Sequence, residues 1–182
     1  MKLLVTGSAG FIGFHLIKRL MKDENIQVIG IDNLNNYYDP ALKFGRLKEC
    51  GIEVTGSQAD NLIQSGIYKN YQFVKTDITH KEKLHELFNQ YKFDAVIHLA
   101  AQAGVRYSLE APGEYIKSNV EGFLNILEGV RQFKTKHLIY ASTSSVYGLN
   151  AKFPFQASDA ANHPVSLYAA TKKANEMMAH SY

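Results

Sequence analysis

The chain has 182 residues, and its 20 lysines and arginines against 17 aspartates and glutamates give a formal net charge of only +3. No basic run is interleaved with aromatic residues, so a nucleic-acid partner is not indicated. Cys50 is the only cysteine, which excludes an internal disulfide and a cysteine-rich metal site. No apolar stretch has the length of a signal peptide or a membrane span, so we expect one cytoplasmic domain over residues 1–182, with no metal and no membrane partner.

The first predicted element is a strand that turns tightly into a helix. The apolar run 2–6 is followed by Gly7, Gly10 and Gly13, and helix-like spacing begins at Phe11. Such a turn points free backbone N–H groups and the positive end of the helix dipole at one spot, where the pyrophosphate of a dinucleotide binds. Glycine is needed because a Cβ would block the turn or the approach of the phosphates. The Gly-x-x-Gly-x-x-Gly spacing departs from the commoner Gly-x-Gly-x-x-Gly, so by itself it is a weak signal.

A second apolar run, 27–31, ends at Asp32, which lies 19 residues past Gly13. About 20 residues is the spacing expected for the acid that binds the ribose of a dinucleotide. A carboxylate there accepts hydrogen bonds from the adenosine hydroxyls and repels a 2′-phosphate, so the sequence predicts NAD rather than NADP. The alternative is that Asp32 only caps a strand-to-loop turn with Asn33.

The rest of the chain alternates helix-like periods with short apolar runs. Residues 41–50 predict a short helix, and 51–66 an exposed connection. Further strands are predicted at 71–75, 95–99 and 137–141, with helices marked by Leu84, Leu87 and Phe88 and by Ile116, Val120, Phe123, Leu124 and Leu127. Near-continuous apolar strands separated by helices predict an α/β fold, a Rossmann-type doubly wound parallel sheet with helices on both faces. Ligands of such sheets bind at the carboxyl ends of the strands.

Two later segments carry groups suited to proton transfer. Tyr168 and Lys172 are four residues apart in an alanine-rich helical stretch, so they share one face of the helix. The lysine cation at this spacing is expected to lower the pKa of the phenol towards the working range of a base. The hydroxyls at 142–145 follow a predicted strand, where they could hold a substrate oxygen. The alternatives are an exposed helix with a solvated lysine, and a polar turn.

Four motifs resemble those of the extended short-chain dehydrogenases, in the NAD-dependent epimerase/dehydratase family. They are Thr-Gly-Ser-Ala-Gly-Phe-Ile-Gly (6–13), the segment that begins His-Leu-Ala-Ala-Gln (98–108), Tyr-Ala-Ser-Thr-Ser-Ser-Val-Tyr-Gly (140–148) and Ser-Leu-Tyr-Ala-Ala-Thr-Lys-Lys-Ala-Asn-Glu (166–176). Within this family, residues 32–38 and 100–108 look like those of the UDP-glucuronate 4-epimerases, including those of capsular polysaccharide synthesis. The resemblance covers the chain and is broken mainly between residues 50 and 70.

The resemblance implies that NAD is the cofactor, with Asp77 at the adenine and Lys172 on the nicotinamide ribose. Asn119 would be the family's structural asparagine beside the cofactor strand, or an ordinary helix residue. Thr143 matches the catalytic Ser/Thr, and Ser142, Ser144 and Ser145 would lie around the sugar. The implied cofactor contacts are Gly7, Gly10, Phe11, Ile12, Gly13, Asp32, Asn33, Asp77, Ile78, Leu99, Ala100, Ala101, Gln102, Asn119, Tyr168 and Lys172.

The resemblance also implies a mechanism, the transient oxidation of a UDP-sugar at C4. Tyr168, as the phenolate, would take the proton of the 4-hydroxyl directly or through Thr143, while the C4 hydride passes to NAD⁺. The resulting 4-keto sugar would rotate and recover the hydride on its other face. UDP-glucuronate and UDP-galacturonate would thereby be interconverted.

A 4-keto uronic acid is a β-keto acid that readily loses carbon dioxide, so a UDP-glucuronate decarboxylase is an alternative. Arg106 is a candidate to fix the sugar carboxylate through its planar fork, or it is an exposed loop arginine. A sugar 4,6-dehydratase needs an acid beside the catalytic threonine, where this chain has Ser144 and Ser145. Dehydration is therefore not expected.

Members of this family continue far beyond the helix that contains Tyr168, whereas only ten residues follow Lys172 here. We therefore expect the C-terminal substrate domain to be missing and one edge of the sheet to be left unpaired, which favours association. A truncated, catalytically inactive module that binds NAD is the second hypothesis. The dimers of the family pack through helices that include the one with Tyr168, so a homodimer is also expected.

Overall fold

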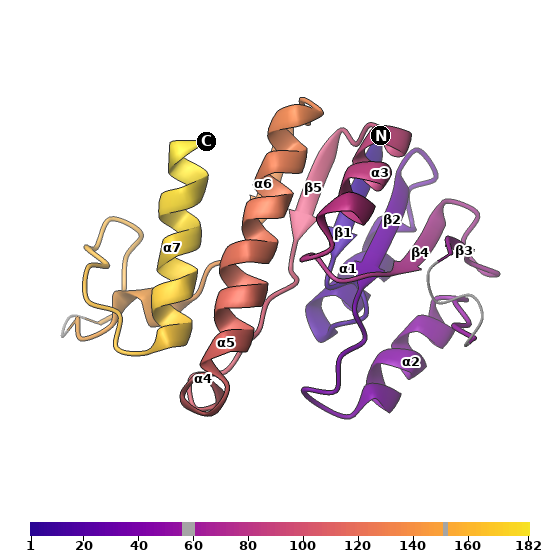
Figure 1. Cartoon of the computed structure of the whole chain (residues 1–182). Helices are drawn as coiled ribbons and strands as arrows, with labels where there is room; N and C mark the ends of the chain where they lie inside the picture. Colours follow the sequence, from indigo (N-terminus) through magenta and orange to yellow (C-terminus); the bar gives the residue numbers. More distant parts are fainter. Residues whose placement is uncertain (56–60, 151–152) are drawn as a thin grey trace.

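The computed structural model describes residues 1–55, 61–150 and 153–182. Its strands are β1 (Lys2–Thr6), β2 (Gln27–Asp32), β3 (Ile63–Gln64), β4 (Tyr71–Lys75), β5 (Ala95–His98) and β6 (His137–Tyr140). They form one sheet in the order β3-β4-β2-β1-β5-β6 (Figure 1). All neighbouring strands pair in parallel except β3, which is antiparallel to β4. The chain moves outward from β1 through β2 to β4 and then crosses back to β5, so β1 and β5 flank the topological switch point.

The helices cover both faces of this sheet. They are α1 (Phe11–Leu20), α2 (Pro40–Glu49), α3 (Lys81–Tyr91), α4 (Tyr107–Glu110), α5 (Pro112–Tyr115), the π-helical segment η2 (Ile116–Gly122), α6 (Phe123–Gln132), the 3₁₀ turn η3 (Ser144–Tyr147) and α7 (Leu167–Ser181). Helices α3 and α6 pack side by side on one face, and α7 lies beyond α6 (Figure 1). The predicted doubly wound α/β fold is thus confirmed.

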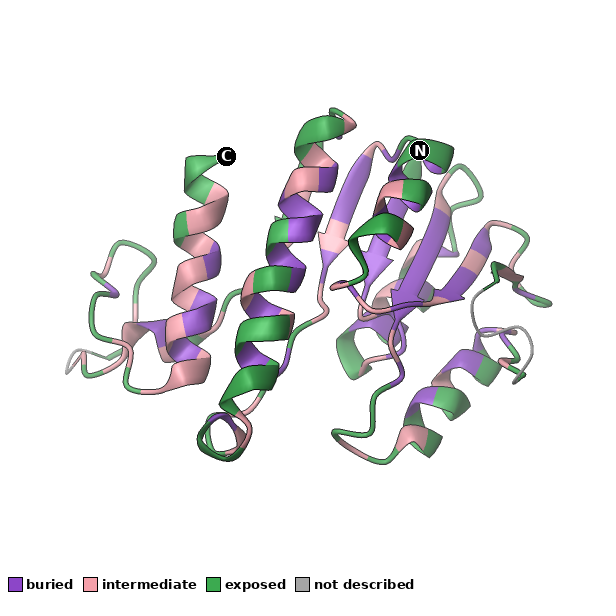
Figure 2. Ribbon diagram, viewed as in Figure 1, coloured by how far each residue is buried: buried purple, intermediate pink, exposed green. Residues whose placement is uncertain are grey.

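Side chains of β1 alternate between two apolar cores, as successive side chains of a strand must. Leu3 and Val5 lie in the core that contains Phe14 of α1 and Leu47 of α2. Leu4 lies in the opposite core. That second core is filled from α3 and α6 by Leu84, Leu87, Phe88 and Ile126. Figure 2 shows the buried strands between helices that are exposed on their outer sides.

Strand β3 corrects one prediction, because part of the connection expected to be exposed pairs with the sheet. Of the segment 51–66, residues 56–60 lie outside the described residues, and Ile63 and Gln64 pair with Phe73 and Gln72. The side-chain amide of Gln64 donates to the carbonyl of Tyr71 at 2.9 Å, so it braces the turn between the two strands. A strand of two residues has no periodicity that a sequence pattern could reveal.

The helix predicted around residues 116–127 exists but is not uniform. It runs as α5, η2 and α6, with a π-helical turn at residues 116–122. Phe123 and Leu127 are buried as their spacing suggests, whereas Ile116 and Leu124 are exposed. A π turn holds more residues than an α turn, so it shifts the phase of the apolar stripe. In the described parts of the chain, no helix combines the length and the apolar character that crossing a membrane requires.

Candidate functional site

The turn from β1 into α1 is packed so closely that it admits only glycine at two positions. Gly7 has φ +69°, and a Cβ on it would lie 2.8 Å from the backbone nitrogen of Ala100. A Cβ on Gly13 would overlap the carbonyl oxygen of Gly7. The turn therefore lies directly against the loop that follows β5. Phe11 and Ile12, at the start of α1, are 66% and 65% exposed, so the N-terminus of the helix is open to a ligand.

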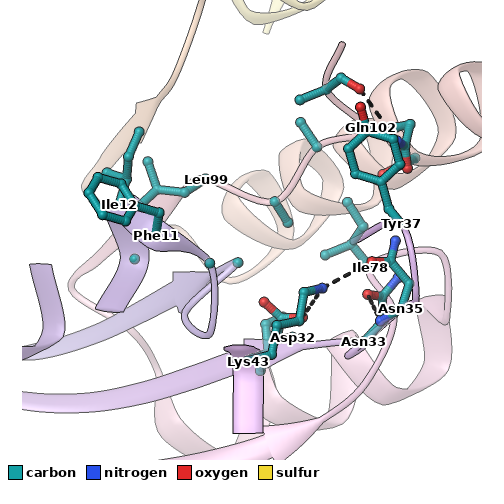
Figure 3. A pocket seen from close by; sticks show the side chains of 18 of the residues that line it. Phe11, Ile12, Asp32, Asn33, Asn35, Tyr37, Lys43, Ile78, Leu99 and Gln102 are labelled. Atoms are coloured by element: carbon teal, nitrogen blue, oxygen red, sulfur yellow. Dashed lines mark hydrogen bonds and ion pairs between the residues drawn. The ribbon is translucent and has the colours of Figure 1, made fainter. Parts of the chain in front are cut away.

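A groove of about 280 Å³ lies at this turn, along the carboxyl ends of β1, β2 and β5 (Figure 3). The predicted cofactor residues that line it are Gly7, Gly10, Phe11, Ile12, Gly13, Asp32, Asn33, Ile78, Leu99, Ala100, Ala101 and Gln102. Asp77 lies beside the groove and accepts a hydrogen bond from Asn33 at 2.7 Å. Burial opposes ionisation of Asp77, but hydrogen bonds from Asn33 and Thr79 hold its pKa below the usual value. The structure thus gathers the predicted adenosine and pyrophosphate residues at one edge of the sheet.

Asp32 is paired with a lysine that the sequence reasoning did not identify. Its carboxylate accepts hydrogen bonds from Lys43 Nζ at 3.0 Å, from the backbone nitrogen of Leu34 at 2.9 Å and from that of Ala9 at 3.3 Å. The side chains of Lys43 and Asp32 are only 7% and 5% exposed. Figure 3 shows them pointing toward each other. The cation offsets the cost of burying the carboxylate, and these three hydrogen bonds leave about one acceptor position of the carboxylate free.

The loop between β2 and α2 forms a wall of the groove, which the sequence reasoning also missed. Tyr37 and Tyr38 both line the groove. The ring of Tyr37 lies 5.1 Å from that of Tyr107, across from the loop after β5. Arg46 of α2 donates to the carbonyl of Ala9 at 3.3 Å and to the Tyr38 hydroxyl at 3.1 Å. These contacts depend on how α2 packs, so no local sequence motif could have predicted them.

The Tyr168–Lys172 pair lies on α7, whose N-terminus is capped by the Ser166 hydroxyl, which accepts from the backbone nitrogen of Ala169 at 3.1 Å. Tyr168 is half-buried, and its ring meets that of Tyr115 edge-on at 6.1 Å. Lys172 is only 3% exposed. Burial lowers the pKa of Lys172 to about 8, and the charge of Glu176 opposes this effect. The side chain therefore remains an ammonium near neutral pH.

The hydroxyl segment lies against the same helix, because η3 packs on α7. Thr143 caps η3 by accepting from the backbone nitrogen of Ser145 at 3.2 Å. Ser142 donates to Glu176 of α7 at 2.6 Å, while Ser144 is exposed. Arg106, at the start of α4, is exposed as well. The fold therefore brings Thr143, Tyr168 and Lys172 to the same end of the sheet, beyond the residues that line the groove.

Asn119 joins the two halves of the site from η2. Its side chain accepts from the backbone nitrogen of Gln102 at 2.7 Å and donates to the carbonyl of Gln102 at 3.0 Å. It also donates to the hydroxyl of Thr171 at 3.1 Å. Asn119 thereby ties the loop that lines the groove to α7.

His98 ends β5 as a neutral ring. Thr6 Oγ1 accepts from the backbone nitrogens of Leu99 at 3.2 Å and Ala100 at 3.0 Å. Its own proton is therefore left to donate to His98 Nδ1, at 2.8 Å. Burial, helped by the charge of Lys172, lowers the pKa of His98 to about 3. The folded protein therefore keeps His98 uncharged in its interior, and protonation of this ring at low pH favours the unfolded state.

This histidine gives a pH prediction. Its folded pKa lies below the unfolded value of 6.5, so its stabilisation is complete above pH 6.5 and is lost as the pH falls towards 3. Between these limits the free energy of unfolding should fall by about 1.4 kcal/mol per pH unit from this group. Urea unfolding at pH 6 and pH 4 should therefore show a loss about 2.5 kcal/mol larger in the wild type than in His98→Asn. The exposed His137→Asn is the control, and equal losses in the wild type and His98→Asn would contradict the assignment.

Together, the sheet order and the glycine turn at the groove define an α/β domain of the dinucleotide-binding class, with Asp32 in the groove and Tyr168 and Lys172 on α7. The chain belongs to the NAD dependent epimerase/dehydratase family, whose model matches residues 3–182. The cofactor predicted from Asp32 is thereby confirmed at the level of the family.

Individual relatives agree with this assignment. The chain is 50% identical to protein CapI of Staphylococcus aureus over 182 residues, which are 100% of this chain and 49% of CapI. It is 46% identical to UDP-glucuronate 4-epimerase 4 of Arabidopsis thaliana, over 98% of this chain and 37% of the relative. A crystal structure of UDP-glucuronic acid 4-epimerase from Bacillus cereus, in complex with UDP-glucuronic acid and NAD, matches with a TM-score of 0.82 and 33% identity, over 100% of this chain and 52% of that one. The chain thus spans about half the length of these proteins or less.

Proposed function

We propose that residues 1–182 form the NAD-binding domain of a UDP-glucuronate 4-epimerase, which interconverts UDP-glucuronate and UDP-galacturonate. The observation that carries this proposal is the packing of α7, with Tyr168 and Lys172, against the Thr143 segment at the end of the sheet that holds the glycine turn. Similarity to UDP-glucuronate 4-epimerases from a plant and from Bacillus cereus supports the choice of sugar.

The residues of the groove fit NAD. No Cβ could be added at Gly7 or Gly13 without a clash, so the backbone N–H groups at the start of α1 remain accessible to a pyrophosphate. Asp32 would accept from the adenosine ribose, and Asp77 would lie at the adenine. When bound, NAD would supply the acceptor and donor of the hydride at C4 of the sugar. Its contacts would be the predicted residues that line the groove, together with Asp77, Asn119, Tyr168 and Lys172.

The chain's own residues would handle the proton and the sugar. Tyr168 would take the proton from the 4-hydroxyl, directly or through the hydroxyl of Thr143, and later return it. Lys172 would hold the nicotinamide ribose and place a positive charge one helical turn from Tyr168. Ser144 and Ser145 would contact the sugar, and Arg106 would bind its C6 carboxylate with a planar pair of donors.

The direct test is to incubate the purified protein with NAD⁺ and UDP-glucuronate and to follow the anomeric proton signals by NMR. The proposal expects the signals of UDP-galacturonate to appear. Formation of UDP-xylose or a 4-keto pentose would identify the activity as that of a decarboxylase and would overturn the epimerase proposal. An unchanged sugar, in a folded protein that binds NAD⁺, would overturn the catalytic proposal and leave an NAD-binding module. The homodimer expected from the sequence stays a prediction.

A further inference from the structure

Asn175, one turn beyond Lys172 on α7, lies between this lysine and the π-helical segment. Its Oδ1 accepts from Lys172 Nζ at 2.9 Å, and its Nδ2 donates to the backbone carbonyl of Asn119 at 2.5 Å. Asn175 and Asn119 are each 1% exposed. Water is thus excluded from both hydrogen bonds, and neither the ammonium nor the carbonyl has an easy replacement partner.

The partner of Asn175 is a backbone carbonyl of the π-helical segment η2. In a π turn the hydrogen bonds run to the fifth residue rather than the fourth, so the carbonyl ladder is loosened, and such turns are frequent at functional sites. The carbonyl of Asn119 lies within η2 and receives a side-chain donor from α7. Asn175 therefore attaches α7 directly to the backbone of the π-helical segment.

An asparagine is the residue type that these two partners require. The ammonium of Lys172 needs an acceptor, and the carbonyl of Asn119 needs a donor. An amide offers both groups at once, whereas an aspartate only accepts and an alanine does neither. The side chain of Asn119 in turn holds both backbone groups of Gln102, which lines the groove. One chain of hydrogen bonds thus runs from Lys172 through Asn175 and Asn119 to the cofactor groove.

We propose that Asn175 is a positioning residue. Its amide bridges the ammonium of Lys172 and the carbonyl of Asn119, and so fixes the position of the lysine relative to the cofactor groove. The importance of this lysine position for catalysis rests on the proposed function of Lys172. The hydrogen bonds themselves do not depend on it, which allows the two ideas to be tested separately.

The test follows the Lys172 ¹³Cε signal by NMR in lysine-labelled protein as the pH is raised, with the signal assigned by its loss in Lys172→Met. The charge of Glu176 of α7 acts on Lys172, and Lys172 in turn acts on the uncharged His98 of β5. Both residues, and Tyr168 one turn away on α7, are retained in every variant. Removing the acceptor in Asn175→Ala should lower the pKa of Lys172 by about 1 from its wild-type value, because the ammonium loses its hydrogen bond. Asn175→Asp, which has nearly the same shape, should raise it, because the new carboxylate favours the cation.

Asn125→Ala is the matched control. Asn125 is also buried, and it donates to the carbonyls of Ile78 at 3.0 Å and Thr79 at 3.3 Å. Its removal should leave the Lys172 pKa unchanged. A Lys172 pKa that stays within about 0.3 of the wild type in Asn175→Ala, or that does not rise in Asn175→Asp, would overturn the proposal. Should the alanine variant fail to fold, the aspartate variant decides. Absence of sugar turnover with the expected titrations would count against the epimerase and leave the role of Asn175 standing.

Discussion

Replacing Tyr168 by phenylalanine should slow the proposed interconversion of UDP-glucuronate and UDP-galacturonate about a thousandfold, because a general base contributes roughly 10²–10⁴-fold. The substitution removes the phenolic oxygen and leaves the ring, so the edge contact with Tyr115 at 6.1 Å and the packing of α7 are kept. The dissociation constant for NAD⁺, measured by calorimetry, should change less than about tenfold, since one hydrogen bond to the ribose is worth about 0.5–1.5 kcal/mol. The loss should therefore appear in kcat rather than in cofactor binding.

Tyr182→Phe is the matched control for this experiment. It likewise removes a phenolic oxygen, but at the far end of α7, where the Tyr182 hydroxyl donates to Glu128 Oε1 at 2.5 Å. Its turnover should equal that of the wild type. A Tyr168→Phe protein with wild-type turnover would show that the proton is taken by another group, and a large loss of NAD⁺ affinity would point to a structural role for the hydroxyl.

The second large effect is expected at Gly13. In Gly13→Ala the new methyl would overlap the carbonyl of Gly7 and lie 2.8 Å from the Cα of Ser8, so the turn between β1 and α1 must open. The N–H groups at the start of α1 would then no longer converge on one phosphate. We expect the dissociation constant for NAD⁺ to rise about 100-fold, a loss of roughly 2.7 kcal/mol, and the free energy of unfolding to fall by about 1–3 kcal/mol.

Gly45→Ala provides the control, because it adds the same methyl group where nothing outside the neighbouring backbone of its own helix lies within 4 Å. Gly45 lies inside α2, so alanine should raise the free energy of unfolding by about 0.5–1 kcal/mol through its higher helix propensity. NAD⁺ affinity should be unchanged in this variant. Calorimetric titration of both proteins separates the effect on NAD⁺ affinity from the effect on stability. Wild-type NAD⁺ affinity in Gly13→Ala would show that the glycine turn does not bind the phosphates.

Local patterns in the sequence were sufficient for the framework of the fold. Apolar runs of five residues predicted the parallel strands β1, β2, β4, β5 and β6 close to their observed bounds. A parallel strand covered on both faces must be apolar on both, whereas β6, at the edge of the sheet, is only partly buried. Topology then placed the glycine turn and Asp32 at one edge, since parallel strands share the direction of their carboxyl ends. The Tyr168–Lys172 spacing is likewise a local property of a helix. These features determine the family and the cofactor, which the comparisons confirm.

The side chains that complete the site were decided by tertiary structure. Lys43 neutralises Asp32, and Asn175 couples Lys172 to Asn119. The first pairing joins α2 to the end of β2, and the second joins α7 to η2, across 56 positions of the chain. Neither pairing can be recognised from a periodic sequence pattern. A lysine or an asparagine on a helix is usually exposed to solvent, and only the packed structure shows that this one is buried. The sequence by itself thus determined the elements and the class of site, whose physics is local, while burial and long-range hydrogen bonding selected the partners of its charged groups.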